Sequence, residues 1–121
     1  MKILTVGTHN KGYYEILQES CKRNNLELIN LGWGKEWKGF TMRYDLMDEY
    51  LDKQDDNEII MFIDAYDVFF LEGEDEILKK FYSYKKNIVF GLQNGLFPTF
   101  TFTKCDGNVL CGGSYMGYSK S

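Results

Sequence analysis

The sequence predicts an α/β protein with a mostly parallel sheet and helices on both faces of that sheet. Residues 59–63 are five consecutive apolar residues, IIMFI, and such a run is typical of a strand buried on both faces between layers of helices. Strand patterns also alternate with helical patterns along the chain, which is the order that builds parallel sheets through right-handed crossovers. We therefore expect an α/β sandwich with residues 59–63 as its central strand.

Each predicted element has its own pattern in the sequence. The strands are short segments rich in apolar residues, and the helices repeat apolar residues every three or four positions. The predicted strands cover residues 1–7, 26–31, 59–63 and 87–92, with an irregular edge strand at 99–103 and a short strand within 109–118. The predicted helices cover residues 11–24 and 42–51 and a segment that begins after residues 71–75.

Length and composition exclude several classes of protein. With 121 residues the chain is expected to form a single domain, residues 1–121, that is long enough for its own core. A net charge of −4 with scattered basic residues argues against a nucleic-acid partner. No stretch approaches the roughly 18 apolar residues of a membrane-spanning helix, so no membrane span is expected.

The amino terminus and the cysteines bear on the location of the protein. The apolar stretch before Gly7 is too short for a signal peptide, so the chain as written is expected to be cytoplasmic. Cys21, Cys105 and Cys111 lack the paired spacing of a zinc site, and they favour a reducing compartment. One disulfide with one free thiol stays open as an alternative.

Two aspartates follow the central strand directly. Asp64 comes immediately after residues 59–63, at the end of the strand where open α/β sheets bind ligands, and Asp67 lies three positions later. Two ionised carboxylates are costly to bury without a positive partner, and Mg²⁺ or Mn²⁺ supplies one while leaving positions for substrate phosphates. In the alternative interpretation, Asp64 caps the turn and Asp67 is solvated or pairs with a lysine. The residues alone leave both interpretations open.

The loop at residues 32–39 contains two tryptophans and three glycines. Large aromatic rings in such a loop are expected to pack on the core or on a ligand. Structural packing is the favoured interpretation for Trp33. For Trp37, packing and ligand binding are equally open.

Four segments resemble a known family, in the family's order and across nearly the whole chain. They are LTVGT at residues 4–8 followed by GY at 12–13, LGWGKEW at 31–37, FIDAYDV at 62–68 and GSYMGY at 113–118. The chain resembles the glycosyltransferase domain at the amino end of procollagen lysyl hydroxylases, and related collagen glucosyltransferases, which have the nucleotide-sugar fold called GT-A. The resemblance implies this Rossmann-like fold.

The resemblance also implies ligands and roles. It implies a UDP-sugar donor, UDP-glucose in particular, a Mn²⁺ or Mg²⁺ ion, and a collagen-like acceptor with hydroxylysine-linked galactose. Asp64 and Asp67 correspond to metal ligands, and Tyr66 corresponds to a residue that stacks on uracil. Val6 and Thr8 are expected to contact the uridine, with Trp37 near the donor. No catalytic residue is assigned.

The chain departs from the family pattern in three places. The loop before the second predicted helix is short and lacks a lysine that contacts the donor phosphates, and only Lys38 or Arg43 lies nearby. Residues 110–113 read LCGG where the family has LNSG. The family's domain also continues with a histidine that completes the metal site, and His9, expected as an exposed loop residue, does not correspond to it. We therefore expect an incomplete domain, in the endoplasmic reticulum lumen if it belongs to a longer family member.

The first hypothesis is thus a metal-dependent glycosyltransferase, and two alternatives remain. One is a Mg²⁺-dependent phosphohydrolase with a strand-end aspartate, although such enzymes place the second acid two positions on. The other is a module that binds UDP without catalysis. In an incomplete domain, apolar faces are left uncovered, so self-association or a covering partner chain is also expected.

Overall fold

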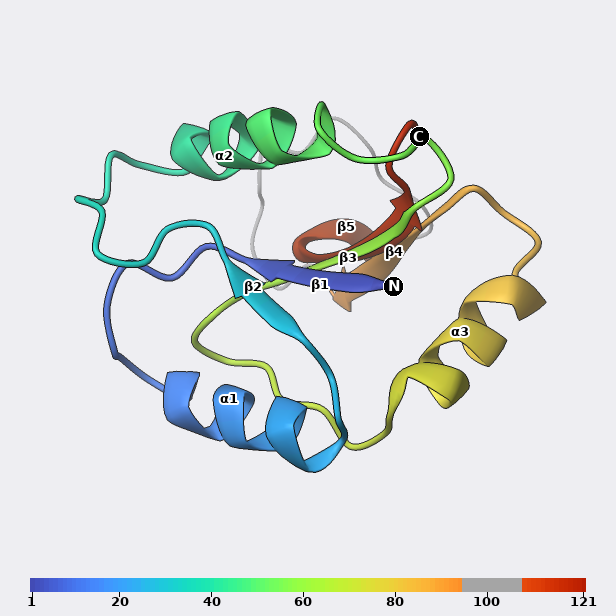
Figure 1. The fold of residues 1–121 in the computed structure, drawn as a ribbon, viewed down its shortest axis with the longest axis horizontal. Helices are drawn as coiled ribbons and strands as arrows, with labels where there is room; N and C mark the ends of the chain where they lie inside the picture. Colours follow the sequence, from blue (N-terminus) through green and yellow to red (C-terminus); the bar gives the residue numbers. More distant parts are fainter. Residues whose placement is uncertain (95–107) are drawn as a thin grey trace.

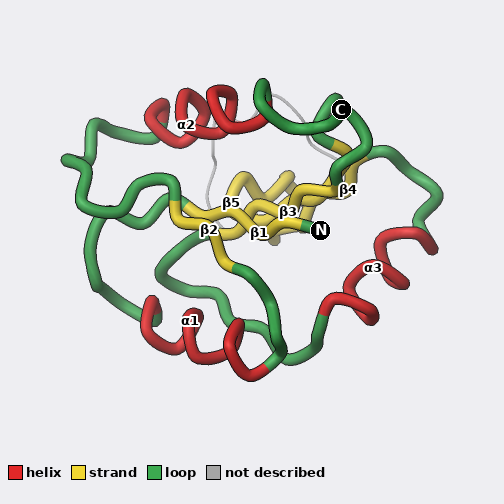
Figure 2. The backbone as a smooth tube through the Cα atoms, in the orientation of Figure 1, coloured by secondary structure: helices red, strands yellow, loops and turns green. Residues whose placement is uncertain are grey.

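The computed structural model of this chain describes residues 1–94 and 108–121. Within these residues, five strands form one sheet, with helix α2 on one face and helices α1 and α3 on the other (Figure 1). Figure 2 shows the strands as a single layer between these helices. The α/β class, with helices on both faces of the sheet, is confirmed.

The bounds of the elements lie close to the predicted ones. The strands are β1 (Lys2–Thr5), β2 (Leu28–Asn30), β3 (Ile59–Ile63), β4 (Ile88–Asn94) and β5 (Asn108–Tyr118). The helices are α1 (Tyr14–Arg23), α2 (Thr41–Leu51) and α3 (Glu74–Ser83). The predicted edge strand at 99–103 lies outside the described residues.

The sheet is mixed, with the strand order β2-β1-β3-β5-β4. Strand β1 is parallel to both β2 and β3, whereas β5 is antiparallel to β3 on one side and to β4 on the other. The parallel part therefore ends at β3, and β5 is a long strand inside the sheet instead of the short one expected within 109–118. Apolar runs predict burial, but the direction of a strand depends on how it is connected, which such runs do not encode.

Alternate residues of β3 pack on opposite faces of the sheet, as expected for a central strand. Ile63 packs with Leu17 of α1, and Phe62 packs with Met47 of α2. Both β3 side chains are almost fully buried. Burying an apolar side chain of this size contributes roughly 1.5–3 kcal/mol, so β3 anchors both helix layers.

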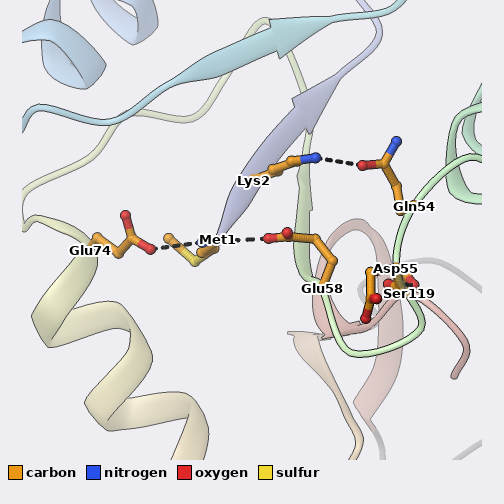
Figure 3. A network of polar contacts seen from close by, with 7 residues as sticks. All are labelled: Met1, Lys2, Gln54, Asp55, Glu58, Glu74 and Ser119. Atoms are coloured by element: carbon orange, nitrogen blue, oxygen red, sulfur yellow. Dashed lines mark hydrogen bonds and ion pairs between the residues drawn. The ribbon is translucent and has the colours of Figure 1, made fainter.

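Polar contacts connect the amino-terminal end of β1 to neighbouring segments of the chain (Figure 3). The buried amino group of Met1 lies 2.8 Å from Glu74 Oε1 and 3.6 Å from Glu58 Oε1, and Lys2 Nζ donates to Gln54 Oε1 at 2.5 Å. Nearby, Ser119 Oγ donates to the carbonyl oxygen of Asp55 at 2.6 Å. We call these residues the amino-end network: Met1, Lys2, Gln54, Asp55, Glu58, Glu74 and Ser119.

Two further observations concern the described residues. Cys21 is buried against the sheet, and neither Cys21 nor Cys111 forms a disulfide. None of the described helices has both the length and the apolar character that crossing a membrane requires.

Candidate functional site

A pocket of about 390 Å³ lies at the carboxyl ends of β1 and β3 and extends to the start of α2. The chain leaves β1 and β2 on this side of the sheet, opposite the N-terminus (Figure 1). All six residues to which the sequence assigned a role in ligand or metal binding line this one pocket: Val6, Thr8, Trp37, Asp64, Tyr66 and Asp67. Residues from three separate loops are thus brought together where α/β folds bind their ligands.

Close contacts join the ends of β1 and β3 and the loops that follow them, beside the pocket. Thr5 Oγ1 donates to the carbonyl oxygen of Ile63 at 2.8 Å, which ties the two strand ends together. Gly7 is buried, and a Cβ atom there would lie 2.9 Å from the Cβ of Ala65, so a larger residue would push the loops apart. The small residues at both positions allow this close approach.

Tyr66 is held from both ends by the loop after β1. Its hydroxyl oxygen accepts a hydrogen bond from the backbone N–H of Thr8 at 2.9 Å, and its carbonyl oxygen accepts one from Tyr13 N–H at 2.9 Å. The second contact requires Gly12, which has a φ of +56° and would place a Cβ 2.7 Å from the Tyr66 carbonyl oxygen. The Tyr66 ring is therefore fixed in the wall of the pocket.

Asp64 directly follows β3 and continues its pairing with β5. Its backbone N–H donates to the carbonyl oxygen of Gly113 at 2.8 Å, which continues the antiparallel pairing one residue past β3. A Cβ atom on Gly113 would lie 2.1 Å from Asp64 Oδ2. Glycine at position 113 is therefore needed to leave room for the carboxylate.

Burial and neighbouring charges shift the pKa of the Asp64 carboxyl group in opposite directions. Burial raises its pKa above the ordinary value of 3.8, the positive charge of Arg43 lowers it, and the negative charge of Asp67 raises it again. Burial outweighs the ion pair with Arg43, so the net shift is upward. A cation shared by Asp64 and Asp67 would relieve both the burial cost and the repulsion.

Arg43, in the first turn of α2, reaches across the pocket to Asp64. Its Nη1 pairs with Asp64 Oδ1, and its Nη2 donates to the carbonyl oxygen of Gly112 at 3.2 Å. The guanidinium carbon lies 5.4 Å from the centre of the Phe62 ring and 5.7 Å from that of Phe40. The other candidate for a phosphate contact, Lys38, is exposed and does not line the pocket.

The two loop tryptophans have different surroundings. Trp33 stacks on the buried ring of Tyr14 with ring centres 5.1 Å apart, as structural packing predicts, although half of Trp33 remains exposed. Trp37 lines the pocket and meets the exposed ring of Phe40 edge-on at 5.8 Å. Trp37 and Phe40 therefore form an aromatic rim on the α2 side of the pocket.

The residues present fit a divalent cation that takes only part of its coordination from protein. Asp64 and Asp67 offer hard oxygen ligands and line the same pocket, where Asp64 is half-buried and lies near the negative charge of Asp67. Within residues 1–94 and 108–121, no group of three or more His, Cys, Asp or Glu residues gathers as a metal site. Water and a phosphate ligand are expected to supply the other positions, as is usual for Mg²⁺.

Several pocket residues had no role assigned from the sequence. His9, Lys11 and Phe40 line the pocket, and His9 is an exposed loop residue as expected, with Nδ1 2.9 Å from Thr8 Oγ1. The position of His9 and Lys11 in the loop after the first strand could have identified them as pocket residues. Phe40 had no such signal, because its place depends on how the loop before α2 folds.

Fold and site together define an α/β domain with an acidic and aromatic ligand pocket at the carboxyl ends of its parallel strands. The family model described as the PLOD GT domain matches residues 1–121, and the chain belongs to this family.

Individual relatives agree with the family assignment. Procollagen-lysine,2-oxoglutarate 5-dioxygenase 1 of Mus musculus is 30% identical over 135 residues, which cover 98% of this chain and 18% of the relative. The multifunctional procollagen lysine hydroxylase and glycosyltransferase of Caenorhabditis elegans is 29% identical over 134 residues, 96% of this chain and 18% of the relative. The Bos taurus dioxygenase 1 is 32% identical over 104 residues, which cover 79% of this chain and 14% of the relative. The chain thus spans less than a fifth of the length of these relatives.

Proposed function

We propose that this chain is the donor-binding part of a metal-dependent glycosyltransferase that uses a UDP-sugar, with UDP-glucose as the donor. The observation that carries this proposal is the gathering of Val6, Thr8, Trp37, Asp64, Tyr66 and Asp67 in one pocket. These residues come from three of the four segments that resemble the family. A volume of about 390 Å³ is also within the usual range for small-ligand sites.

Each side chain has a proposed task. The Tyr66 ring stacks on uracil, Val6 and Thr8 contact the uridine, and Trp37 lies beside the donor sugar. Asp64 and Asp67 hold Mn²⁺ or Mg²⁺. When bound, such an ion neutralises the negative charge that develops on the departing diphosphate.

The fixed position of Tyr66 supports its proposed task. Because both its hydroxyl and its carbonyl oxygen are hydrogen-bonded to the loop after β1, the ring loses little conformational freedom when a base stacks on it. The hydrogen bond to the hydroxyl group also fixes Thr8 beside the ring. The base and the ribose are thus expected to meet a preformed surface.

The acceptor and the location belong to the same proposal. One relative is named as both a lysine hydroxylase and a glycosyltransferase of procollagen, which supports a collagen-like protein as the acceptor. We propose hydroxylysine-linked galactose as the group in that protein to which the sugar is added. Family membership favours the endoplasmic reticulum lumen over the cytoplasm.

We also propose that this chain alone transfers sugar poorly. Two carboxylates leave the ion loosely held, and transfer requires the reacting groups to be positioned closely. Exposed apolar side chains are proposed to contact further protein, from the same or another chain. Among them are Ile88 and Leu92 of β4 and Leu110 of β5.

Calorimetry with UDP, in the presence and absence of Mn²⁺, tests the proposal. We expect UDP to bind with Mn²⁺, to bind much more weakly with EDTA, and to be preferred over ADP and CDP. Hydrolysis of p-nitrophenyl phosphate without affinity for UDP would instead support the phosphohydrolase alternative. Binding of UDP, with no transfer from UDP-glucose even by a longer natural chain, would support the non-catalytic module.

A further inference from the structure

Arg43 is the described cation that pairs with Asp64, and it is held on several sides. Its side chain is 13% exposed, it lies near the Phe40 and Phe62 rings, and its Nη2 donates to the Gly112 carbonyl oxygen. The buried Nε has no hydrogen-bond partner within the described residues. The guanidinium therefore still has hydrogen-bonding capacity, and it lines the pocket.

The two oxygens of Asp64 have different neighbours. Oδ2 is packed against the backbone of β5, where a methyl group on Gly113 would lie only 2.1 Å away. Oδ1 pairs with Arg43 Nη1. A cation that binds Asp64 through Oδ1 therefore competes with Arg43 for the same oxygen.

We propose that Arg43 is the counter-ion of Asp64 in the ligand-free chain and turns to the donor diphosphate when a divalent cation takes Asp64 Oδ1. This inference rests on the proposed function, since it needs a diphosphate ligand in the pocket. The unpartnered Nε–H lies on the side edge of the guanidinium. Nη1, once released, presents an N–H beside one of Nη2 at the end of the guanidinium, which gives two neighbouring donors. Two such donors match the oxygens of a phosphate group.

This exchange couples the two ligands. Without nucleotide, the ion has to displace Arg43 with no compensating contact, so the ion binds weakly. Without the ion, Asp64 holds Arg43 back from the diphosphate, so the nucleotide binds weakly. Each ligand thereby raises the affinity for the other, and Arg43 carries part of that coupling.

The test uses Arg43→Met, which keeps an apolar stem against Phe40 and Phe62 and removes the charge. Titrations followed by electron paramagnetic resonance measure Mn²⁺ alone, and calorimetry measures UDP with Mn²⁺ and uridine without phosphate. We expect Mn²⁺ alone to bind about fivefold more tightly, since a competing ion pair worth roughly 1 kcal/mol is lost. UDP with Mn²⁺ should bind about tenfold more weakly, because a charge-assisted hydrogen bond to phosphate is lost. Uridine affinity should not change.

The matched control is Lys38→Met, which removes one positive charge from the loop just before α2 but from outside the pocket. It should change none of the three affinities by more than about twofold, because exposed charges are screened. If Arg43→Met does not fold, Arg43→Lys replaces it. Its ammonium still pairs with Asp64 but cannot form two parallel hydrogen bonds, so UDP should bind more weakly than to wild type with Mn²⁺ affinity changed little.

The outcomes separate the two proposals. If wild type binds no UDP with Mn²⁺, the proposed function fails and this inference fails with it. If wild type binds UDP and Arg43→Met weakens Mn²⁺ and UDP together, or changes neither, Arg43 is only structural and this inference alone is overturned. Unchanged UDP affinity in Arg43→Lys overturns it as well.

Discussion

Each end of the sheet has a cation near two carboxylates, but the three charges are arranged differently. At the amino end, one cation, the Met1 amino group, lies within 3.6 Å of both Glu58 and Glu74. At the carboxyl end, within the described residues, Arg43 pairs with Asp64, while Asp67 forms no ion pair. The amino end thus shares its cation between two carboxylates, whereas the carboxyl end does not.

This difference shows in the pKa values. The hydrogen bond with Glu74 raises the pKa of the Met1 amino group, which is the sign of a satisfied cation. Burial is the main cause of the raised pKa of Asp64; Asp67 raises it further, and the positive charge of Arg43 offsets these effects only in part. Geometry, more than composition, therefore distinguishes the structural cluster from the ligand site.

We expect the largest effect from Gly113→Ala, which changes the carboxyl end of the sheet directly beside Asp64. The new methyl group must displace the Asp64 carboxylate, since it would lie 2.1 Å from Oδ2. We expect Mn²⁺-dependent UDP affinity to fall by about 10- to 100-fold, as when a metal ligand loses its support. Overpacking should also lower the free energy of unfolding by about 1–3 kcal/mol.

Gly112→Ala is the matched control, one residue away in the same strand. Its Cβ would meet Arg43 Nη2 at 3.9 Å, an ordinary contact. Calorimetry and urea unfolding should place this variant near wild type, within about 0.5 kcal/mol. Equal losses in both variants would mean that β5 is sensitive to any substitution and that Asp64 has no special position.

The next effect concerns the wall of the pocket. Tyr66→Ala should weaken UDP binding about tenfold, since stacking of a base on an aromatic ring contributes roughly 1–3 kcal/mol. Tyr66→Phe keeps the ring but removes the acceptor for Thr8 N–H, so it should lower the free energy of unfolding by about 1 kcal/mol with a smaller loss of UDP affinity. Equal loss of affinity in both variants would instead assign the binding to the hydroxyl group.

Sequence patterns predicted the part of the molecule that depends on local burial. The apolar run at 59–63 identified β3 as the central strand, and the aspartates that follow it led to the pocket. Most of the expected strands and helices were found close to their predicted bounds, although β5 is longer than the short strand expected within 109–118. The edge strand expected at 99–103 lies outside the described residues. Local patterns were sufficient where an element has a periodic or continuous apolar pattern, as in α1 and β3.

Contacts between distant residues could not be predicted. The sequence left Lys38 and Arg43 as equal candidates, and only the packing of α2 on the sheet brings Arg43 to Asp64. The hydrogen bond between Thr8 and Tyr66 joins residues 58 positions apart. The antiparallel direction of β5 likewise depends on chain connections and not on its apolar residues.

The smallest effect is expected at the amino end, from Glu74→Gln. This change weakens a single, partly exposed ion pair. The free energy of unfolding should therefore fall by at most about 1 kcal/mol. UDP affinity should not change. Because the Met1 amino group has its pKa raised from 8.0, its contribution is complete below pH 8 and is lost as the pH rises through the raised value. Urea unfolding should therefore show a difference between wild type and variant that shrinks above pH 8. A loss of UDP affinity in Glu74→Gln would mean that the amino end is not a purely structural cluster separate from the ligand site.

We propose that the carboxyl end of the sheet binds a divalent cation together with UDP through Asp64 and Asp67. Electron paramagnetic resonance of Mn²⁺, with and without UDP, tests it most directly when wild type is compared with Asp67→Ala, an exposed position whose change leaves the core intact. We expect UDP to increase the amount of Mn²⁺ bound to wild type and to have little such effect in Asp67→Ala. The same UDP-dependent binding of Mn²⁺ in both proteins would contradict it.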